Sequence, residues 1–172
     1  MTISAALFVA LTFIQAPVQQ PDVVLALTCG DQPRDLVLTL RNAGASDTAI
    51  LLGRMLSNGQ RYEPRELVVE LTRSGRAEPE DLVFRGVSGV AGRIDHWVVP
   101  LPARAAFTMT LQSSDFVSTT QPTPSEPPAA VRIRLVGRAV TADLNVDMVG
   151  MKAWRVWTGS ARSNLVQLSQ CS

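Results

Sequence analysis

The feature that most constrains this chain is an alternation of apolar and polar residues with a period of two. The segments Leu36–Arg41, Leu67–Leu71, Phe107–Gln112 and Val131–Leu135 each place an apolar side chain at every second position. Successive side chains of a β-strand point to opposite faces, so this pattern predicts strands with one buried face. No segment keeps the three- and four-residue spacing of an amphipathic helix over several turns. We therefore expect an all-β fold.

Turn-forming residues separate these segments. Asn42–Gly44 follows one strand, Ser57–Gly59 contains the Asn-Gly pair that favours tight hairpins, and Pro100–Pro102 precedes another strand. About seven to nine short strands with turns between them are typical of an antiparallel β-sandwich. The expected strands are Val23–Thr28, Asp35–Arg41, Thr48–Leu52, Glu66–Thr72, Asp81–Arg85, Ile94–Val99, Ala105–Gln112, Ala130–Gly137 and Ser163–Ser169.

Residues 17–172 are expected to form a single domain. The segment Gln121–Pro128 holds four prolines and cannot lie in a central strand, because proline lacks the ladder donor. We interpret it as an exposed loop within the sandwich, since the strands after it are too few to form a core of their own.

The amino-terminal segment, residues 1–16, is signal-peptide-like. Ile3–Ile14 is almost purely apolar, yet it is shorter than the roughly 20 apolar residues that span a bilayer. We expect a secreted or periplasmic protein with no transmembrane span in the mature chain. No Lys or Arg precedes the run, and cleavage after Ala16 would leave Pro17 at the new terminus. An upstream start, a retained anchor and a buried first element therefore remain alternatives.

The two cysteines, Cys29 and Cys171, each lie at the end of a strand-like segment. An even number of cysteines in an exported chain predicts a disulfide. A bridge over a loop this long removes about 4–5 kcal/mol of unfolded-state entropy in the simple chain model. The alternative is a pair of free, buried thiols in a cytosolic protein.

The charge and composition exclude several partners. The formal net charge is +1, which provides no clustered basic field for nucleic acid or for anionic membrane surfaces. One histidine and two cysteines offer few soft metal ligands, so we expect no cofactor.

His96 is the single histidine, and any Ser-His-Asp or Cys-His mechanism must use it. Asp95 precedes it, but neighbouring residues of a strand point to opposite faces and would not orient the ring. Gly86–Gly89 lacks the spacing of a nucleophile elbow. We therefore expect no catalysis; the alternative is a hydrolase that uses His96 or a calcium-assisted site.

The candidate calcium site is Asp143, Asn145 and Asp147, whose oxygen side chains match the first, third and fifth positions of a calcium loop. The match ends at the sixth position, Met148, and at the twelfth, Trp154, where glycine and glutamate are required. We interpret the segment as an extended loop whose side chains bond to the backbone.

Trp154 and Trp157 lie three residues apart and form a possible binding surface for a sugar ring or a peptide. Tryptophans near the last strand of a sandwich more often fill the core. We therefore expect at least one of them to be buried.

Arg132 and Arg134 are a second possible binding surface. These two residues and Arg41 lie at positions whose side chains point away from the core. If their strands were neighbours, the three arginines would form a basic stripe that could bind an acidic partner. We expect instead that they pair across strands with acidic residues. The candidates are Glu66, Glu70 and Asp81.

Four segments resemble known proteins. Leu36–Gly44 resembles a strand and turn of bacterial immunoglobulin-like domains, and Ser57–Tyr62 is similar to a hairpin of the bacterial Ig-like proteinase-inhibitor family. Val99–Phe107 resembles a strand entry of the same class, which usually has glycine near the position of Arg104. The closing Trp157–Val166 looks like the final strand of uncharacterised secreted bacterial proteins.

The resemblance implies an immunoglobulin-like fold and export. Together with the absence of catalytic residue sets, it predicts a non-catalytic binding or protein-interaction module. The partner would be a protein or an envelope component. Its recognition loops would be segments such as Arg85–Arg93 and Gln121–Pro128. A proteinase-inhibitor-like protein is the alternative within this class.

Overall fold

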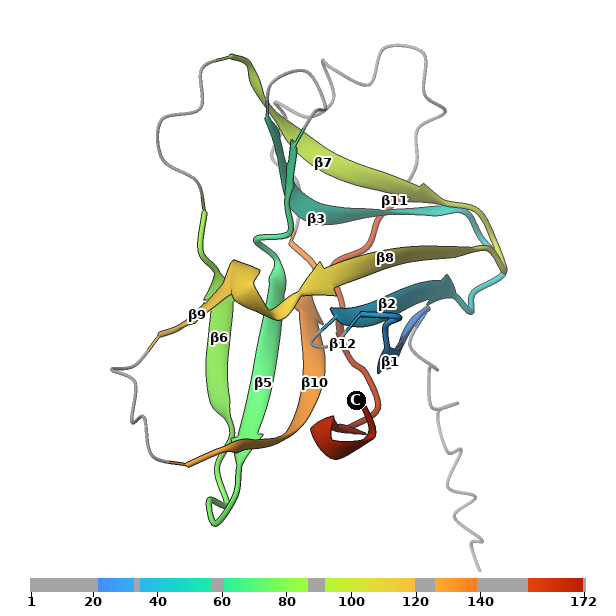
Figure 1. The fold of residues 1–172 in the computed structure, drawn as a ribbon. Helices are drawn as coiled ribbons and strands as arrows, with labels where there is room; N and C mark the ends of the chain where they lie inside the picture. The colour runs from blue at the N-terminus through green and yellow to red at the C-terminus, as the bar shows by residue number, and fades with distance from the viewer. Residues whose placement is uncertain are drawn as a thin grey trace, which may run out of the picture.

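The computed structural model describes residues 22–32, 35–56, 61–86, 92–119, 126–138 and 155–171 (Figure 1). These residues form strands and short 3₁₀ turns, and no α-helix occurs among them. The predicted all-β fold is thereby confirmed. Every strand pairing recorded in these ranges is antiparallel except the one between β11 and β3. The signal-like segment, residues 1–16, lies outside the described residues.

Sheet A has the strand order β1-β2-β8. Its strands are β1 (Val23–Cys29), β2 (Asp35–Asn42) and β8 (Ala106–Gln112). The expected alternation is present in β2, where Leu36, Leu38 and Leu40 are buried. Every second residue of β1 is also buried, because one face of the sheet packs on the core while the other meets water.

Sheet B is built around β3 (Thr48–Leu56). β7 (Ile94–Leu101) pairs along one edge of β3, and β4 (Arg61–Glu63) and β11 (Arg155–Val156) pair with it as well. All residues from position 48 to 53 are buried, which explains why the sequence is continuously apolar here instead of alternating.

Sheet C has the order β12-β10-β5-β6-β9, and β13 also pairs with β10. Pro128 is the first residue of β10, a position where the missing N–H is tolerated. The strands are β5 (Leu67–Arg73), β6 (Glu80–Phe84), β9 (Phe116–Ser118), β10 (Pro128–Val136), β12 (Ser160–Arg162) and β13 (Val166–Gln167).

The chain passes from sheet A to sheet C at a 3₁₀ turn, η2 (Ser113–Asp115), which separates β8 from β9. Figure 1 shows β8 crossing in front of β5 and turning into β9 beside β6. Strands that switch sheets in this way join the two layers at a corner. The buried leucines and valines of all three sheets form one apolar cluster. The arrangement is sandwich-like.

The carboxyl-terminal strand expected at Ser163–Ser169 is confirmed only in part, because the observed strand is shorter. Only Val166–Gln167 is extended and paired, and Leu168–Gln170 forms a 3₁₀ turn, η3. Ser163 ends the regular ladder, because its hydroxyl accepts a hydrogen bond from the Ile133 N–H at 2.9 Å in place of a backbone carbonyl.

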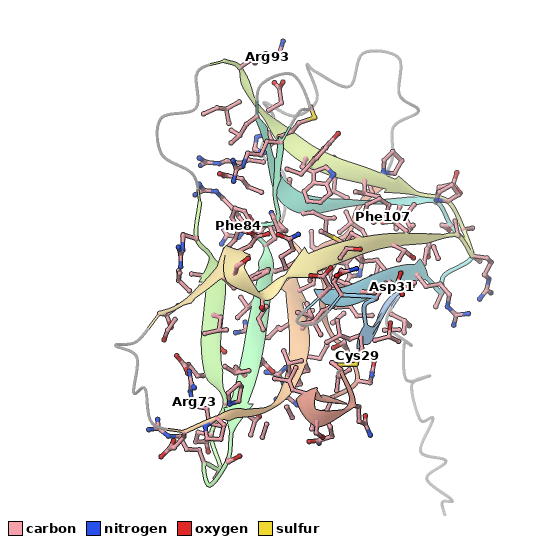
Figure 2. The ribbon with its side chains drawn as sticks, in the orientation of Figure 1. Cys29, Asp31, Arg73, Phe84, Arg93 and Phe107 are labelled. Atoms are coloured by element: carbon pink, nitrogen blue, oxygen red, sulfur yellow. A yellow bond between two sulfur atoms is a disulfide. The ribbon has the colours of Figure 1, made fainter. Side chains whose placement is uncertain are left out.

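Cys29 and Cys171 form the predicted disulfide, with a Cα–Cα distance of 5.1 Å (Figure 2). The bridge joins the end of β1 to the residue after η3, across 142 positions of sequence. Among the described residues, no helix has the length and apolar character needed to cross a membrane.

Arg104 adopts the left-handed backbone conformation, with φ of 67°. It follows Pro102 in the turn before β8, and this turn is closed by a hydrogen bond from the Ala105 N–H to the Pro102 carbonyl. The position at which the resembling domains carry glycine is therefore one where glycine has a steric advantage.

Candidate functional site

Several sequence-predicted sites lie outside the described residues. They include the calcium candidates Asp143, Asn145 and Asp147, together with Trp154 and most of the loop Gln121–Pro128. Within the described ranges, no group of three or more His, Cys, Asp or Glu side chains is placed to hold a metal ion.

His96 is exposed on β7, and its cross-strand neighbour is Arg54. The adjacent Asp95 carboxylate accepts a hydrogen bond from Arg93 Nε at 2.5 Å. The strand pairing thus places a cation opposite the imidazole, whereas a catalytic histidine needs a carboxylate that orients its ring. The geometry gives no support to the hydrolase alternative at this residue.

Trp157 is buried, with 7% of its surface exposed. Its backbone N–H donates to the Ala49 carbonyl at 2.9 Å, and its ring lies against Gly137 and Gly159. A Cβ at Gly159 would lie 2.7 Å from the ring. The expectation that at least one of the two tryptophans is buried is confirmed, and Trp157 as a binding-surface residue is wrong because the core covers it.

Arg132 and Arg134 meet the carboxylate of Glu70, which is 4% exposed. Arg134 Nε donates to Glu70 Oε1 at 2.7 Å, Arg132 Nε donates to the other oxygen, and Arg162 contributes a longer bond of 3.3 Å. Arg134 also donates to Asp81 at 2.6 Å. The expected cross-strand pairing is confirmed.

This arginine cluster holds Glu70 ionised. Burial would raise the pKa of Glu70, but the hydrogen bonds from Arg134 and Arg132 and the charge of Arg162 together lower it below its ordinary value. Arg41 does not join the cluster, because β2 belongs to sheet A and β10 to sheet C. The condition for a stripe of Arg41, Arg132 and Arg134, that their strands are neighbours, is therefore not met. Shared parity does not by itself place strands in one sheet.

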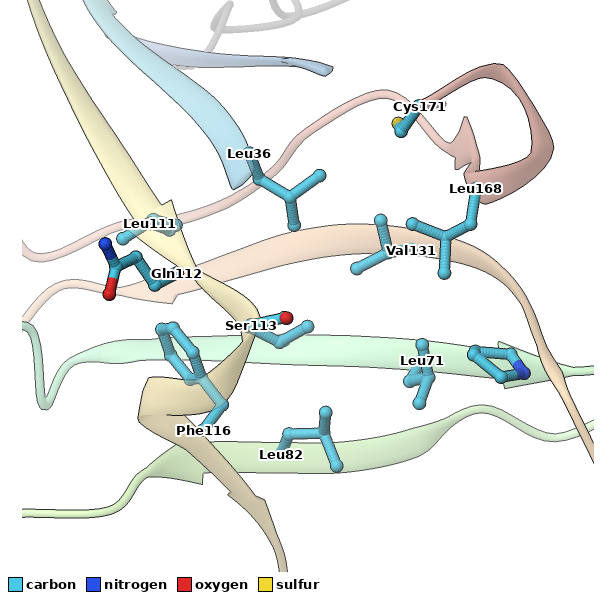
Figure 3. A pocket seen from close by; sticks show the side chains of 12 residues that line it. Leu36, Leu71, Leu82, Leu111, Gln112, Ser113, Phe116, Val131, Leu168 and Cys171 are labelled. Carbon is cyan, nitrogen blue, oxygen red and sulfur yellow. The ribbon is translucent and has the colours of Figure 1, made fainter. Parts of the chain in front are cut away.

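A cavity of about 420 Å³ opens between sheets A and C (Figure 3). Leu36 and Leu111 line it from sheet A, where they are direct cross-strand partners. Leu71 and Val131 line it from sheet C, where they are likewise partners. We call this space the inter-sheet cavity.

The disulfide shapes one wall of the inter-sheet cavity. Cys171 and Leu168 both line it, and the bridge to Cys29 ties their turn, η3, to β1. Figure 3 shows Leu168 and Cys171 on the same side of the space as Val131. The covalent link therefore limits how far this wall can move away from the sheets.

The lining of the inter-sheet cavity is chemically simple. Among the described residues that line it, Gln112 and Ser113 are the polar side chains, and the others are apolar, with no ionisable acid or base. Binding pockets for small molecules commonly measure roughly 300–1,000 Å³ and combine apolar walls with a few polar groups. The arrangement suits a neutral, largely apolar ligand.

The sequence predicted the inward orientation of these residues but not the cavity. Leu36, Leu111 and Val131 all have inward parity in their strands, as filled core positions also have. The space between them depends on the separation of two sheets, and strand periodicity carries no information about that distance.

No protein-family model, curated protein or solved structure matches this chain. The similarity to immunoglobulin-like and proteinase-inhibitor domains accordingly rests on the segments quoted above, such as Leu36–Gly44 and Ser57–Tyr62.

Proposed function

We propose that this chain is an exported, non-catalytic binding protein with an immunoglobulin-like β-sandwich, and that the inter-sheet cavity holds a neutral apolar ligand. The observation that carries the proposal is the cavity itself, an apolar space of about 420 Å³ between two paired sheets. Burial of apolar ligand surface in such a space contributes about 25 cal/mol per Å² removed from water.

The walls of the cavity are built on regular strands. Leu36, Leu111 and Val131 project from hydrogen-bonded ladders, and the disulfide holds Leu168 and Cys171 nearby. A site formed in this way needs little reorganisation when a ligand enters, so less binding energy is lost to ordering. This rigidity supports a binding role over an induced closure around substrate.

Two features support export. The apolar run Ile3–Ile14 resembles the hydrophobic core of a secretory signal, and the Cys29–Cys171 bridge is a covalent feature that persists mainly in oxidising compartments. The expected location is therefore outside the cytoplasm, where a carrier of apolar compounds has a clear physical use, because such compounds dissolve poorly in water.

The test uses N-phenyl-naphthylamine, a neutral probe whose fluorescence rises in apolar sites, with n-decanol as competitor. We expect saturable fluorescence enhancement that n-decanol reverses. Leu71→Trp should weaken probe binding about tenfold or more by filling the cavity, a change of about 1.4 kcal/mol. Val68→Trp is the matched control, because Val68 lies on the same strand with outward parity.

Thermal melting establishes that both variants fold, and Leu82→Phe replaces Leu71→Trp if the latter does not. Equal probe binding by the filled variant and by Val68→Trp would exclude the inter-sheet cavity as the site. Failure of the unmodified protein to enhance the fluorescence of the probe would have the same consequence.

The β3–β4 pair supports a second candidate, proteinase inhibition. Leu56 and Arg61 pair directly across the hairpin, and Tyr62 beside them is 47% exposed. An exposed aromatic residue next to a hairpin can enter a partner's specificity pocket. Titration against a panel of serine and cysteine proteases tests this candidate, and full protease activity at excess protein would dismiss it.

A further inference from the structure

A second open space, of about 450 Å³, shares two lining residues, Leu111 and Phe116, with the inter-sheet cavity. Five aromatic residues line it, in a chain that has five Phe, three Trp and one Tyr in total. They are Tyr62, Phe84, Trp97, Phe107 and Phe116, and we call this space the aromatic crevice. Figure 2 labels Phe84 and Phe107, which belong to sheets C and A.

Trp97 is the central ring of the aromatic crevice. Its centroid lies 4.8 Å from that of Tyr62, with the planes tilted by 52°, and 6.4 Å from that of Phe107 in an edge-on arrangement. The three rings come from different strands, β7, β4 and β8, so the fold brings them together from distant parts of the sequence. Trp97 and Phe107 are half-buried and Tyr62 is exposed, which leaves ring surface open to a ligand.

Of the described residues that line the aromatic crevice, Asp115 is the one with an acidic or basic side chain. It lies in η2, and its side chain is half-buried. Among the described residues, no hydrogen bond or ion pair is recorded for its carboxylate, in contrast to Glu70, which three arginines surround. A partly desolvated carboxylate beside aromatic faces attracts positive charge, because it has lost part of its hydration and the part of the chain that the structure describes gives it no recorded countercharge.

We propose that the aromatic crevice binds an organic cation of the quaternary or alkyl ammonium class. The electron-rich faces of Tyr62, Trp97 and Phe107 attract a cation, and Asp115 supplies the balancing charge. A neutral apolar chain would gain nothing from the carboxylate and would desolvate it further. The aromatic crevice shares Leu111 and Phe116 with the inter-sheet cavity, but it is lined by five rings and by the Asp115 carboxylate.

The test is calorimetric titration of the unmodified protein with choline and with its neutral isostere, in which a tert-butyl group replaces trimethylammonium. We expect saturable binding of choline and at least about tenfold weaker binding of the isostere, since the two differ in charge and hardly in shape. Equal affinities would overturn the proposal, as would the absence of choline binding. Tighter binding of the isostere would show an apolar site instead.

Two variants locate the site. Asp115→Asn should weaken choline binding about tenfold, while Asp31→Asn, which removes an exposed carboxylate near the end of β1, should leave it unchanged. Trp97→Leu should also weaken binding. Identical affinities of the Asp115 and Asp31 variants would overturn the assignment. If Asp115→Asn fails to fold, the comparison of choline with its isostere on the unmodified protein still tests whether the site recognises positive charge.

Leu71→Trp separates the two proposals. This change fills the inter-sheet cavity, and Leu71 does not line the aromatic crevice, so choline binding should persist when binding of the naphthylamine probe is lost. Loss of choline binding in this variant, with an unchanged melting temperature, would contradict the independence of the two sites.

Discussion

The side-chain amide of Asn164 pairs with the backbone of Leu27, which is 137 positions away in sequence. The Leu27 N–H donates to Asn164 Oδ1 at 2.8 Å, and Asn164 Nδ2 donates to the Leu27 carbonyl at 2.9 Å. Leu27 lies in β1, at the edge of sheet A, and Asn164 lies between β12 and β13 of sheet C. One side chain thus acts as a strand partner and holds the carboxyl-terminal segment against the opposite sheet.

Replacement of Asn164 should therefore destabilise the fold. Asn164→Ala leaves a donor and an acceptor of Leu27 without their partner, and we expect a loss of about 1–3 kcal/mol in the free energy of unfolding. Urea denaturation measures it. Gln167→Ala is the control, because Gln167 is exposed and pairs through its backbone. Equal stability of the two variants would show that the Asn164 amide contributes nothing.

Loss of the disulfide should have a larger effect. Replacement of Cys29 and Cys171 by alanine should cost about 2–5 kcal/mol, since the bridge closes a loop that spans most of the domain. The mass of the purified protein before and after reduction checks whether the bridge forms, because reduction of one disulfide adds two hydrogens. If reduction left the mass unchanged, the protein would contain no disulfide and the prediction would be contradicted.

The Glu70 cluster predicts a loss of stability in acid. The pKa of Glu70 is lowered in the folded protein, so the unfolded chain binds the proton more readily. The stabilisation is fully present above the ordinary value of 4.5 and is lost as the pH falls through the lower, folded pKa. Glu70→Gln should therefore reduce the fall in melting temperature between neutral and acidic pH.

Glu78→Gln is the control for that experiment, because Glu78 is exposed. It should keep the acid dependence of the unmodified protein. At neutral pH, Glu70→Gln should be the less stable of the two, since Arg132, Arg134 and Arg162 then surround a neutral group. A pH profile of Glu70→Gln that matches that of Glu78→Gln would remove Glu70 from the explanation.

Arg104 offers a test of backbone strain. Its φ of 67° disfavours any residue that has a Cβ, so Arg104→Gly should be more stable than Arg104→Ala by about 1 kcal/mol. Both variants lose the hydrogen bond from the guanidinium to the Ala43 carbonyl, and their difference therefore isolates the backbone. Thermal melting of the pair measures it, and greater stability of the alanine variant would contradict the prediction.

Local periodicity predicted the strands well. The expected Val23–Thr28 and Asp35–Arg41 correspond to β1 and β2, because side-chain alternation follows directly from strand geometry. The pairing of Arg132 and Arg134 with Glu70 was also predictable, since all three share outward parity. The disulfide followed from the even number of cysteines, although Cys171 follows the 3₁₀ turn η3 and not the end of a strand.

The candidate sites were not predictable in this way. Tyr62, Trp97 and Phe107 are scattered along the sequence, and nothing in their spacing indicates that three strands place their rings together. The one sequence feature that could have drawn attention to these three residues is the small number of aromatic residues in the chain. The place of Asp115 beside these rings likewise depends on how the fold brings β8 and η2 to them.

By itself, the sequence determined that the chain forms strands, which residues of each strand face inward, and that Cys29 and Cys171 are able to close a loop. The three-dimensional structure was needed to show that Arg41 and Arg134 lie in different sheets, that the chain passes from β8 into sheet C through η2, and that space remains beside Leu111. The reason is that the two kinds of property depend on contacts over different distances along the sequence. Alternation is a property of neighbouring residues, whereas strand order and sheet separation follow from contacts among the whole apolar cluster.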